Sequence, residues 1–305
     1  MTINSTTFVL LTSIAIVATA VPVCNASELN SSPPHQEAVT LRLPLSISGD
    51  TELQSQFGLS ASIPTTVEPV NNTDWRKTAL LIKQQKYQQA VTLLLPLAKS
   101  GDTESQTQLG SLYENGLGVP RNLDTARRWY ESAAEQNYPR AQVNLGVLFQ
   151  SGTGVSKDLT TAIYWFKKAV ALNDPRAQAK LAYIYLAEPG YKQFENEAVE
   201  LLKSSAEAGY QEAQFNFAML LLEGERGITK DKTRATNLLK QSADQNNPAA
   251  MNVLAILYLR DSKTSGNIAL AYELLQHSVD LGFEPARSNL AKLCRESPEV
   301  CQIKK

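Results

Sequence analysis

The chain has 305 residues, 43% of them hydrophobic and 19% charged, with a formal net charge of −1. This composition is typical of a folded soluble protein, and the nearly balanced charge argues against nucleic acid as a partner. Length alone predicts about two domains, but an internal repeat that begins near residue 74 predicts one linear array instead.

The N-terminus contains an apolar run, 8–23, which is shorter than the roughly 20 residues of a membrane span. The run includes an A-x-A pattern at 18–20, and 24–26 offers a second cleavage site. We therefore predict a signal peptide at 1–26, an exported mature chain without a membrane span, and a periplasmic location ahead of a secreted one. Because no Lys or Arg precedes the run, an uncleaved membrane anchor is the alternative. Cys24 follows Val23 rather than a small residue, which argues against lipidation.

Residues 27–73 are rich in Ser, Pro, Thr and Asn, which predicts a loose extension. One island inside it, 40–58, is identical to 92–110 at 13 of 19 positions, so the extension holds a stray half-repeat. Two interpretations stay open. The island packs on the first repeat as a cap, or it is an unordered remnant of a duplication.

The rest of the chain repeats a helix–turn–helix unit. A small residue opens each first helix at steps of 36, 36, 36, 37 and 36 residues: Ser105, Ala141, Ala177, Ala213, Ala250 and Ala286. An alanine in each second helix follows the same steps: Ala90, Ala126, Ala162, Ala198, Ala235 and Ala271. Such a period is typical of a solenoid, so we predict an all-α array of five to six units over 74–294 and a tail at 295–305. The single extra residue is expected in the turn 223–230, where an insertion costs least.

Small and apolar residues recur on one face of each first helix; in one unit they are Ala141, Leu145, Gly146 and Phe149. That face is expected to pack on the second helix. The turns 116–119 and 152–155 read GLGV and GTGV, and glycine allows the left-handed backbone that ends a helix. Asp74 is predicted to be an N-cap, and Asp124 and Asp158 are predicted near the start of a second helix, where a carboxylate meets unpaired backbone N–H groups and the positive end of the helix dipole.

The units 103–138 and 139–174 closely follow the pattern A-x-x-x-L-G-x-x-Y-x-x-G-x-G-V-x-x-D-x-x-x-A-x-x-W-Y-x-x-A-A. They resemble the Sel-1-like repeat family, relatives of the tetratricopeptide repeats, and the resemblance covers about 75–293 of the chain. The units 175–210 and 248–283 depart from the pattern in the turn between their helices. The geometry of these two turns therefore stays open, while the predicted fold is unaffected. The resemblance implies a right-handed superhelix of helix pairs that holds other proteins or glycan assemblies and is usually not catalytic.

One side of the first helices faces away from the second helices, and it is polar at first and apolar from Tyr183 onward. We predict that this concave side is a groove for another protein or peptide, because contiguous exposed apolar surface usually marks a binding site. The residues predicted to line the groove are Tyr183, Phe215, Met219, Leu222 and Ile256. The alternative is that curvature of the array buries these side chains between neighbouring units. A polar rim is predicted from three recurring asparagines: Asn144, Asn216 and Asn289.

Catalysis has little support in the sequence. The two histidines, His35 and His277, stand alone, and no HExxH, GxSxG or Ser-x-x-Lys pattern occurs. No metal site and no cofactor are predicted either. We expect a non-catalytic scaffold or adaptor, with an accessory role in envelope assembly or polysaccharide export as the alternative. Some exported members of the resembled family are reported to bind or hydrolyse penicillin-type substrates, so a penicillin-binding or β-lactamase-like activity is the most distant alternative.

Cys294 and Cys301 are the two cysteines that remain after the predicted signal peptide is removed, and Pro298 lies between them. In an oxidising compartment we expect them to form a disulfide that closes the C-terminal end of the array. Closing so short a loop would stabilise the fold by roughly 2.5 kcal/mol. The alternative is a pair of free, half-buried thiols.

Overall fold

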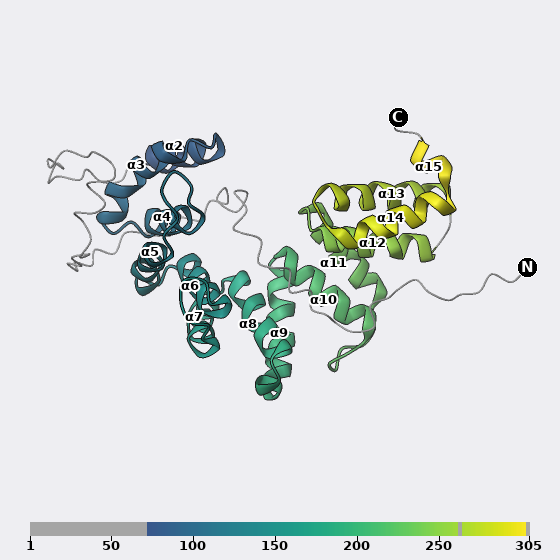
Figure 1. The fold of residues 1–305 in the computed structure, drawn as a ribbon. Helices are drawn as coiled ribbons and strands as arrows, with labels where there is room; N and C mark the ends of the chain where they lie inside the picture. Colours follow the sequence, from purple (N-terminus) through teal and green to yellow (C-terminus); the bar gives the residue numbers. More distant parts are fainter. Residues whose placement is uncertain (1–71, 262–263, 303–305) are drawn as a thin grey trace, which may run out of the picture. The chain divides into compact units, whose positions relative to one another are not determined.

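The computed structural model describes residues 72–261 and 264–302 (Figure 1). The predicted signal peptide, nearly all of the extension and the island at 40–58 lie outside the described residues. Regular structure in the described ranges consists of α-helices and one short 3₁₀ helix, η2 (Pro189–Phe194). No helix in these ranges has both the length and the apolar character to cross a membrane. The all-α class predicted from the sequence is confirmed.

First and second helices of the repeat alternate along the chain. The first helices are α2 (Asn72–Lys83), α4 (Thr103–Asn115), α6 (Pro139–Ser151), α8 (Pro175–Ala187), α10 (Gln211–Glu223), α12 (Pro248–Asp261) and α14 (Glu284–Glu296). The second helices are α3 (Tyr87–Lys99), α5 (Leu123–Glu135), α7 (Leu159–Ala171), α9 (Glu195–Glu207), α11 (Lys232–Asp244) and α13 (Ser265–Asp280), and the short α15 (Pro298–Gln302) follows α14. Each first helix from α2 to α12 packs against the second helix that follows it, which confirms the predicted helix pairs.

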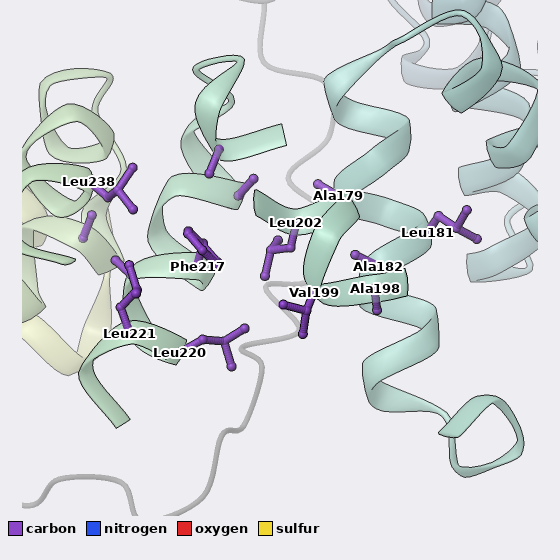
Figure 2. Close-up of a cluster of buried hydrophobic side chains, with 14 of the residues drawn as sticks. Ala179, Leu181, Ala182, Ala198, Val199, Leu202, Phe217, Leu220, Leu221 and Leu238 are labelled. Carbon is purple, nitrogen blue, oxygen red and sulfur yellow. The ribbon is translucent and has the colours of Figure 1, made fainter. Parts of the chain in front are cut away.

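The described helices form two compact units, 72–136 and 137–302. In the larger unit, α6 to α12 contribute to one apolar core. Figure 2 shows part of this core, where Leu181 from α8, Leu202 from α9 and Phe217 from α10 are among the buried side chains. A smaller cluster around Leu275 and Leu293 joins α12, α13 and α14.

A small residue on each first helix is matched by a large residue on its second helix. A Cβ on Gly110 would lie 2.5 Å from Cε1 of Tyr130, and one on Gly146 would lie 2.6 Å from Cε1 of Phe166. Only glycine therefore fits opposite these rings in a close-packed interior. At the same repeat positions, the later units have alanine and leucine: Ala182 with Leu202, Ala218 with Leu239, and Ala255 with Leu275. All ten residues are buried, so the two positions together keep a similar volume from unit to unit.

Glycine ends three first helices in the left-handed conformation expected from the sequence, at Gly116 (φ 67°), Gly152 (φ 75°) and Gly224 (φ 67°). The turns 116–122 and 152–158 have seven residues and the turn 224–231 has eight. The extra residue of the repeat therefore lies in the predicted turn.

Gly118, the second glycine of the first turn, has a role that the sequence did not indicate. Its φ is 72°, and a Cβ there would lie 2.5 Å from the carbonyl carbon of Tyr87 and 2.6 Å from the backbone nitrogen of Gln88. The start of α3 thus packs directly on the backbone of this turn.

The turn after α8 has no such glycine pair. Its segment η2 places the rings of Tyr191 and Phe194 at centroid distances of 5.7 and 4.7 Å from the ring of Tyr185. An aromatic cluster therefore holds this turn against its helix pair, in place of the glycine-based geometry of the turns after α4, α6 and α10.

The predicted N-cap at Asp74 is wrong, whereas Asp124 and Asp158 lie near the starts of their helices as predicted. Asn122 rather than Asp124 caps α5, its side chain accepting a hydrogen bond from the backbone N–H of Thr125 at 3.0 Å. Asp74 lies inside α2 instead of preceding it. Asp158 caps α7 as predicted, by accepting hydrogen bonds from backbone N–H groups in its first turn. A cap must be the extended residue directly before the helix, and a repeat pattern places helix ends only to within one or two residues.

The C-terminal end carries the predicted disulfide. It joins Cys294 in α14 to Cys301 in α15, with Cα atoms 5.7 Å apart. Cys294 occupies the repeat position that Tyr185 and Tyr258 hold in earlier first helices. α15 packs against α13 and α14, so it covers part of the end of the array. Helical structure also continues past the array boundary predicted at 294, because α14 ends only at Glu296 and α15 follows.

Candidate binding surface

The candidate surface is the face of the first helices that points away from their second helices. If the small residue that opens each first helix is position one, then positions one, five, six and nine form the buried side, and positions three, seven and ten lie opposite. We call these opposite positions the outward row. In the larger unit its members are Val143, Val147, Gln150, Ala179, Tyr183, Leu186, Phe215, Met219, Leu222, Asn252, Ile256, Leu259, Ser288, Lys292 and Arg295.

The five residues predicted to line the groove all belong to this outward row, and together they are called the apolar row: Tyr183 on α8, Phe215, Met219 and Leu222 on α10, and Ile256 on α12. All five are half-buried. Tyr183, Phe215 and Leu222 also pack against the apolar core. These three side chains thus contribute to the fold, all five keep part of their surface exposed, and their role in binding stays a prediction.

Position three of the outward row is the most enclosed. Val143, Ala179 and Asn252 are buried there, whereas the larger Phe215 is only half-buried at the same position. Positions seven and ten are half-buried on α6, α8, α10 and α12. Contact with another molecule is therefore available mainly through positions seven and ten and the ring of Phe215.

The predicted polar rim is used in part for contacts within the fold. Asn289 Nδ2 donates a hydrogen bond to Asn252 Oδ1 at 2.8 Å, which ties α14 to α12. Lys180, at the same repeat position as the rim asparagines, forms an ion pair with Glu212 at 2.9 Å and ties α8 to α10. Asn144 and Asn216 are half-buried. The rim thus contains inter-unit links, and no common ladder of asparagines is present in the described residues.

A carboxylate lies beside the apolar row at the end of α10. Glu223 follows Leu222, and its Oε2 atom is buried without a hydrogen-bond partner. Burial raises the pKa of Glu223, the nearby Glu225 raises it further, and Lys230 opposes the shift. The carboxylate is therefore a weaker acid than usual, and this side of the apolar row favours a neutral over a negatively charged group.

The smaller compact unit, 72–136, has a polar pair of side chains at two repeat positions where the later repeats have apolar residues. Tyr130 donates its hydroxyl to Glu114 Oε2 at 2.8 Å, and burial raises the pKa of Glu114 despite this bond. The corresponding residues in the next unit are Gln150 and Phe166, and later units have leucine at both positions. The leucines of the outward row are thus explained partly by their apolar partners on the second helices.

Recurring glutamines at position two of the first helices were missed by sequence reasoning. Four successive units have one, and all four are buried: Gln106, Gln142, Gln178 and Gln214. Gln106 Nε2 donates to the carbonyl of Ala98 at 3.0 Å, and Gln136 Nε2 donates to Gln106 Oε1 at 3.0 Å. Gln106 therefore joins its first helix to the second helices on either side of it, and Gln214 exchanges hydrogen bonds with Gln241 and Gln245 of its own second helix and its end. The signal was present in the sequence as the pair A-Q or S-Q at the start of these four units.

Buried serines near the ends of three second helices were also missed. Ser205, Ser242 and Ser278 donate their hydroxyls to the carbonyls of Pro175, Gln211 and Pro248 at 2.5, 2.7 and 2.7 Å. Each bond links the end of a second helix to the start of its own first helix. The first two full units have Ala133 and Ala169 at this position.

The described residues offer no constellation for metal chemistry, because no group of three or more His, Cys, Asp or Glu side chains gathers there. His277 is exposed on α13. The arrangement of the outward row supports the binding of another molecule through apolar and charged contacts.

Comparison with known proteins identifies the repeat. The family model for the Sel1 repeat matches five consecutive segments, 103–138, 139–174, 175–210, 211–247 and 248–283, which together make up more than half of the chain. These are the unit boundaries predicted from the steps in the sequence.

Solved structures and curated proteins agree with this match. A Sel1 repeat protein from Oxalobacter formigenes is similar with 28% identity and a TM-score of 0.64, over 74% of this chain and 91% of that one. A protective antigen of uropathogenic Escherichia coli with an SLR fold is similar with 25% identity and a TM-score of 0.54, over 74% of this chain and 52% of that one. The DAP3-binding cell death enhancer 1 of Rattus norvegicus is 37% identical over 110 residues, which are 36% of this chain and 18% of that protein.

This chain thus spans less than a fifth of the length of the rat protein that it matches. The repeats and both structural neighbours lead to one conclusion about the array. The chain belongs to the Sel1 repeat family, whose helix-pair solenoids generally mediate protein–protein interaction and are typically not catalytic.

Proposed function

We propose that this chain is an exported, non-catalytic scaffold that holds a segment of a partner protein against the apolar row. The observation that supports the proposal is the set of half-buried apolar side chains at equivalent repeat positions of three successive first helices. Leu222, at position ten, is explained partly by its apolar partner on the second helix, but Met219 and Ile256, at position seven, lie off the side that packs there, so the fold alone does not require apolar residues at all of these positions. A partner that covers them would remove the remaining apolar surface from water.

The apolar row is expected to give only part of the binding free energy. Fully burying one large apolar side chain contributes about 1.5–3 kcal/mol, so completing the burial of five half-buried ones contributes about 5 kcal/mol. Association costs an estimated 4–15 kcal/mol in lost translational and rotational freedom. Polar or charged contacts beside the apolar row are therefore needed for stable binding.

Replacing Phe215 and Met219 with glutamate is expected to abolish partner binding while the helices remain intact. Two carboxylates would have to be desolvated under the bound segment, which costs more than the lost apolar contacts. The measurement is a pull-down from cell-envelope extract with the wild-type protein and the double variant, and circular dichroism reports whether both remain helical.

A matched control places the same charges elsewhere on the array. Tyr164 on α7 and Leu172, directly after that helix, are 51% and 45% exposed, so Tyr164→Glu with Leu172→Glu should leave capture unchanged. If the control variant and the Phe215→Glu/Met219→Glu variant lose the partner equally, then added negative charge anywhere on the array prevents capture, and the apolar row is not the specific site. Unfolding of the Phe215→Glu/Met219→Glu protein would show that the apolar row is core, and the proposal would be wrong.

Export is the second part of the proposal, and the disulfide between Cys294 and Cys301 supports it because such bonds persist in oxidising compartments. Protein isolated from its own cells with thiols blocked at lysis should have no alkylated cysteine in 294–301 until it is reduced. Full alkylation of both cysteines without reduction would place the protein in a reducing compartment. N-terminal sequencing of the same sample would distinguish a cleaved signal peptide from an uncleaved anchor.

A further inference from the structure

The first helix α4 is enclosed on every side, unlike α6, α8, α10 and α12. Nine consecutive residues of α4, 105–113, are buried, and they include positions four and seven, Gln108 and Ser111. These two residues are only 6% and 7% exposed. On α6, α8, α10 and α12, positions four and seven are half-buried in every case. The side of α4 that corresponds to the open side of those helices is therefore covered.

The described helices of the smaller unit do not supply this cover. Within 72–136, α4 packs against α3 and α5. Gly110 lies against Tyr130 of α5, and Gln106 donates a hydrogen bond to the carbonyl of Ala98 in α3, so both contacts use other sides of α4. Helices α8 and α10 also pack between two second helices, and they lie in the middle of the array. Because both keep positions four and seven half-buried, the array alone does not bury these positions.

A buried amide on the covered side has an acceptor without a partner. Gln108 Nε2 donates a hydrogen bond to Glu104 Oε1 at 2.7 Å, which assigns the other amide atom, Oε1, as the acceptor. Gln108 Oε1 is buried, and no donor within the described ranges reaches it. A buried acceptor without a partner is unfavourable, so an N–H group is expected opposite it. The covering group therefore has to supply a hydrogen-bond donor.

We propose that the chain's own segment 59–71, which directly precedes α2 and lies outside the described residues, covers positions four and seven of α4. In this arrangement the segment runs in an extended form, and one of its backbone N–H groups is directed at Gln108 Oε1. The inference goes beyond the proposed function, because it concerns an occupant from within the chain on the smaller unit. This side of α4 is then closed to other molecules, and partner binding is left to the apolar row.

The sequence of the segment suits an extended course over a polar helix face. It reads LSASIPTTVEPVN, and its two prolines, Pro64 and Pro69, favour extended backbone in themselves and in the residues before them. Many of its other residues are small or carry hydroxyl groups, as do Thr107 and Ser111 on α4. Close approach of two backbones needs such small side chains at the contact.

The length of the segment allows it to reach α4. Neighbouring helices pack about 10 Å apart, so α2 and α4, which both pack on α3, are at most about 20 Å apart. Thirteen extended residues span up to about 40 Å. The entropy cost of closing a loop rises with its length, so 59–71 reaches α4 at a lower cost than the more distant island at 40–58.

The test is photo-cross-linking in the full chain. A small diazirine-bearing amino acid replaces Ser111, and mass spectrometry locates the residue to which it becomes joined. The expected cross-link lies within 59–71 of the same molecule, and a mixture of unlabelled and isotope-labelled chains distinguishes it from a cross-link between two copies. The matched control has the same amino acid in place of Ile256, which holds position seven on α12, and should give no cross-link to 59–71.

Three outcomes would overturn the inference: a cross-link from position 111 to the island at 40–58, a cross-link to a second copy, or no cross-link to the N-terminal part of the chain. None of them affects the proposed function, which depends on partner capture by the apolar row and is tested separately with Phe215→Glu/Met219→Glu.

A smaller change serves if the photo-reactive side chain lowers the helicity of the protein. Ser111→Cys adds a thiol of nearly the same size, whose alkylation in the folded chain reports how well the position is covered. Replacing 59–71 with a Gly–Ser sequence of the same length should raise the alkylation rate about tenfold, which corresponds to about 1.4 kcal/mol of lost cover. The same replacement should leave the alkylation of Ile256→Cys unchanged. An unchanged rate for Ser111→Cys would show that another part of the molecule covers α4, and the inference would be wrong.

Discussion

Gly146→Ala is expected to destabilise the protein by about 1–2 kcal/mol, although alanine is the better helix former. The new Cβ would lie 2.6 Å from Cε1 and 2.8 Å from Cδ1 of the fully buried Phe166 ring. Overpacking of this kind costs about 1–3 kcal/mol, while the gain in helix propensity is only about 1 kcal/mol. The measurement is the urea midpoint followed by circular dichroism.

The same change should be tolerated when Phe166 becomes leucine. Phe166→Leu alone leaves a cavity and is expected to cost about 1–2 kcal/mol. The double variant recreates the pairing of Ala182 with Leu202 in the next unit, so its cost should fall below the sum of the single costs by at least about 1 kcal/mol. Additive costs would show that the two positions are independent and that the pairing described here does not determine the packing.

Gly118→Ala is expected to cost about 2–4 kcal/mol, the larger of the two effects. The residue has φ 72°, which alanine adopts only with strain, and its Cβ would meet backbone atoms of Tyr87 and Gln88 at 2.5 and 2.6 Å. Backbone cannot move aside by a change of rotamer, so α3 must shift away from the turn. Loss of stability in the smaller unit can be followed by amide hydrogen exchange in α3 and α4.

Gly227 provides the matched control. Its φ is 76°, and no neighbouring atom lies within 4 Å of the place that a Cβ would occupy, so Gly227→Ala carries the backbone strain without the clash. Its cost should be about 1 kcal/mol. If both substitutions cost the same, then the close approach of α3 to the turn contributes nothing to stability.

The helix pairs could be predicted because the same positions recur in every unit. Ala141, Ala177 and Ala213 are each fully buried, as a small residue at the contact of two helices should be. The extra residue was also predicted correctly to lie in the turn after α10, because the one longer step between equivalent residues shows which turn contains the insertion. The sequence of a single repeat would have given neither result. The apolar pattern of one amphipathic helix shows which face is buried, but it does not show which helix packs on that face.

The polar contacts between helices could not be predicted in the same way. Gln142 is fully buried, yet an isolated glutamine in a sequence is expected at the surface. Ser242 is buried through a hydrogen bond to a carbonyl 31 residues away, which no local pattern indicates. The apolar row is the third case, because periodicity shows that Phe215 lies off the core face but not how closely the neighbouring first helices approach it.

The position of Cys294 has a consequence for how arrays of this kind change in length. The disulfide joins α14 to α15, and α15 also packs on α13, so the last helix pair before them needs only to present a second helix that fits α14 and α15. A complete unit could therefore be gained or lost upstream of α14 by recombination between like segments, while the terminus stayed the same. Such a change would lengthen or shorten the apolar stretch of the first helices and leave the disulfide-bonded end in place, so the length of the array could evolve separately from its C-terminal closure.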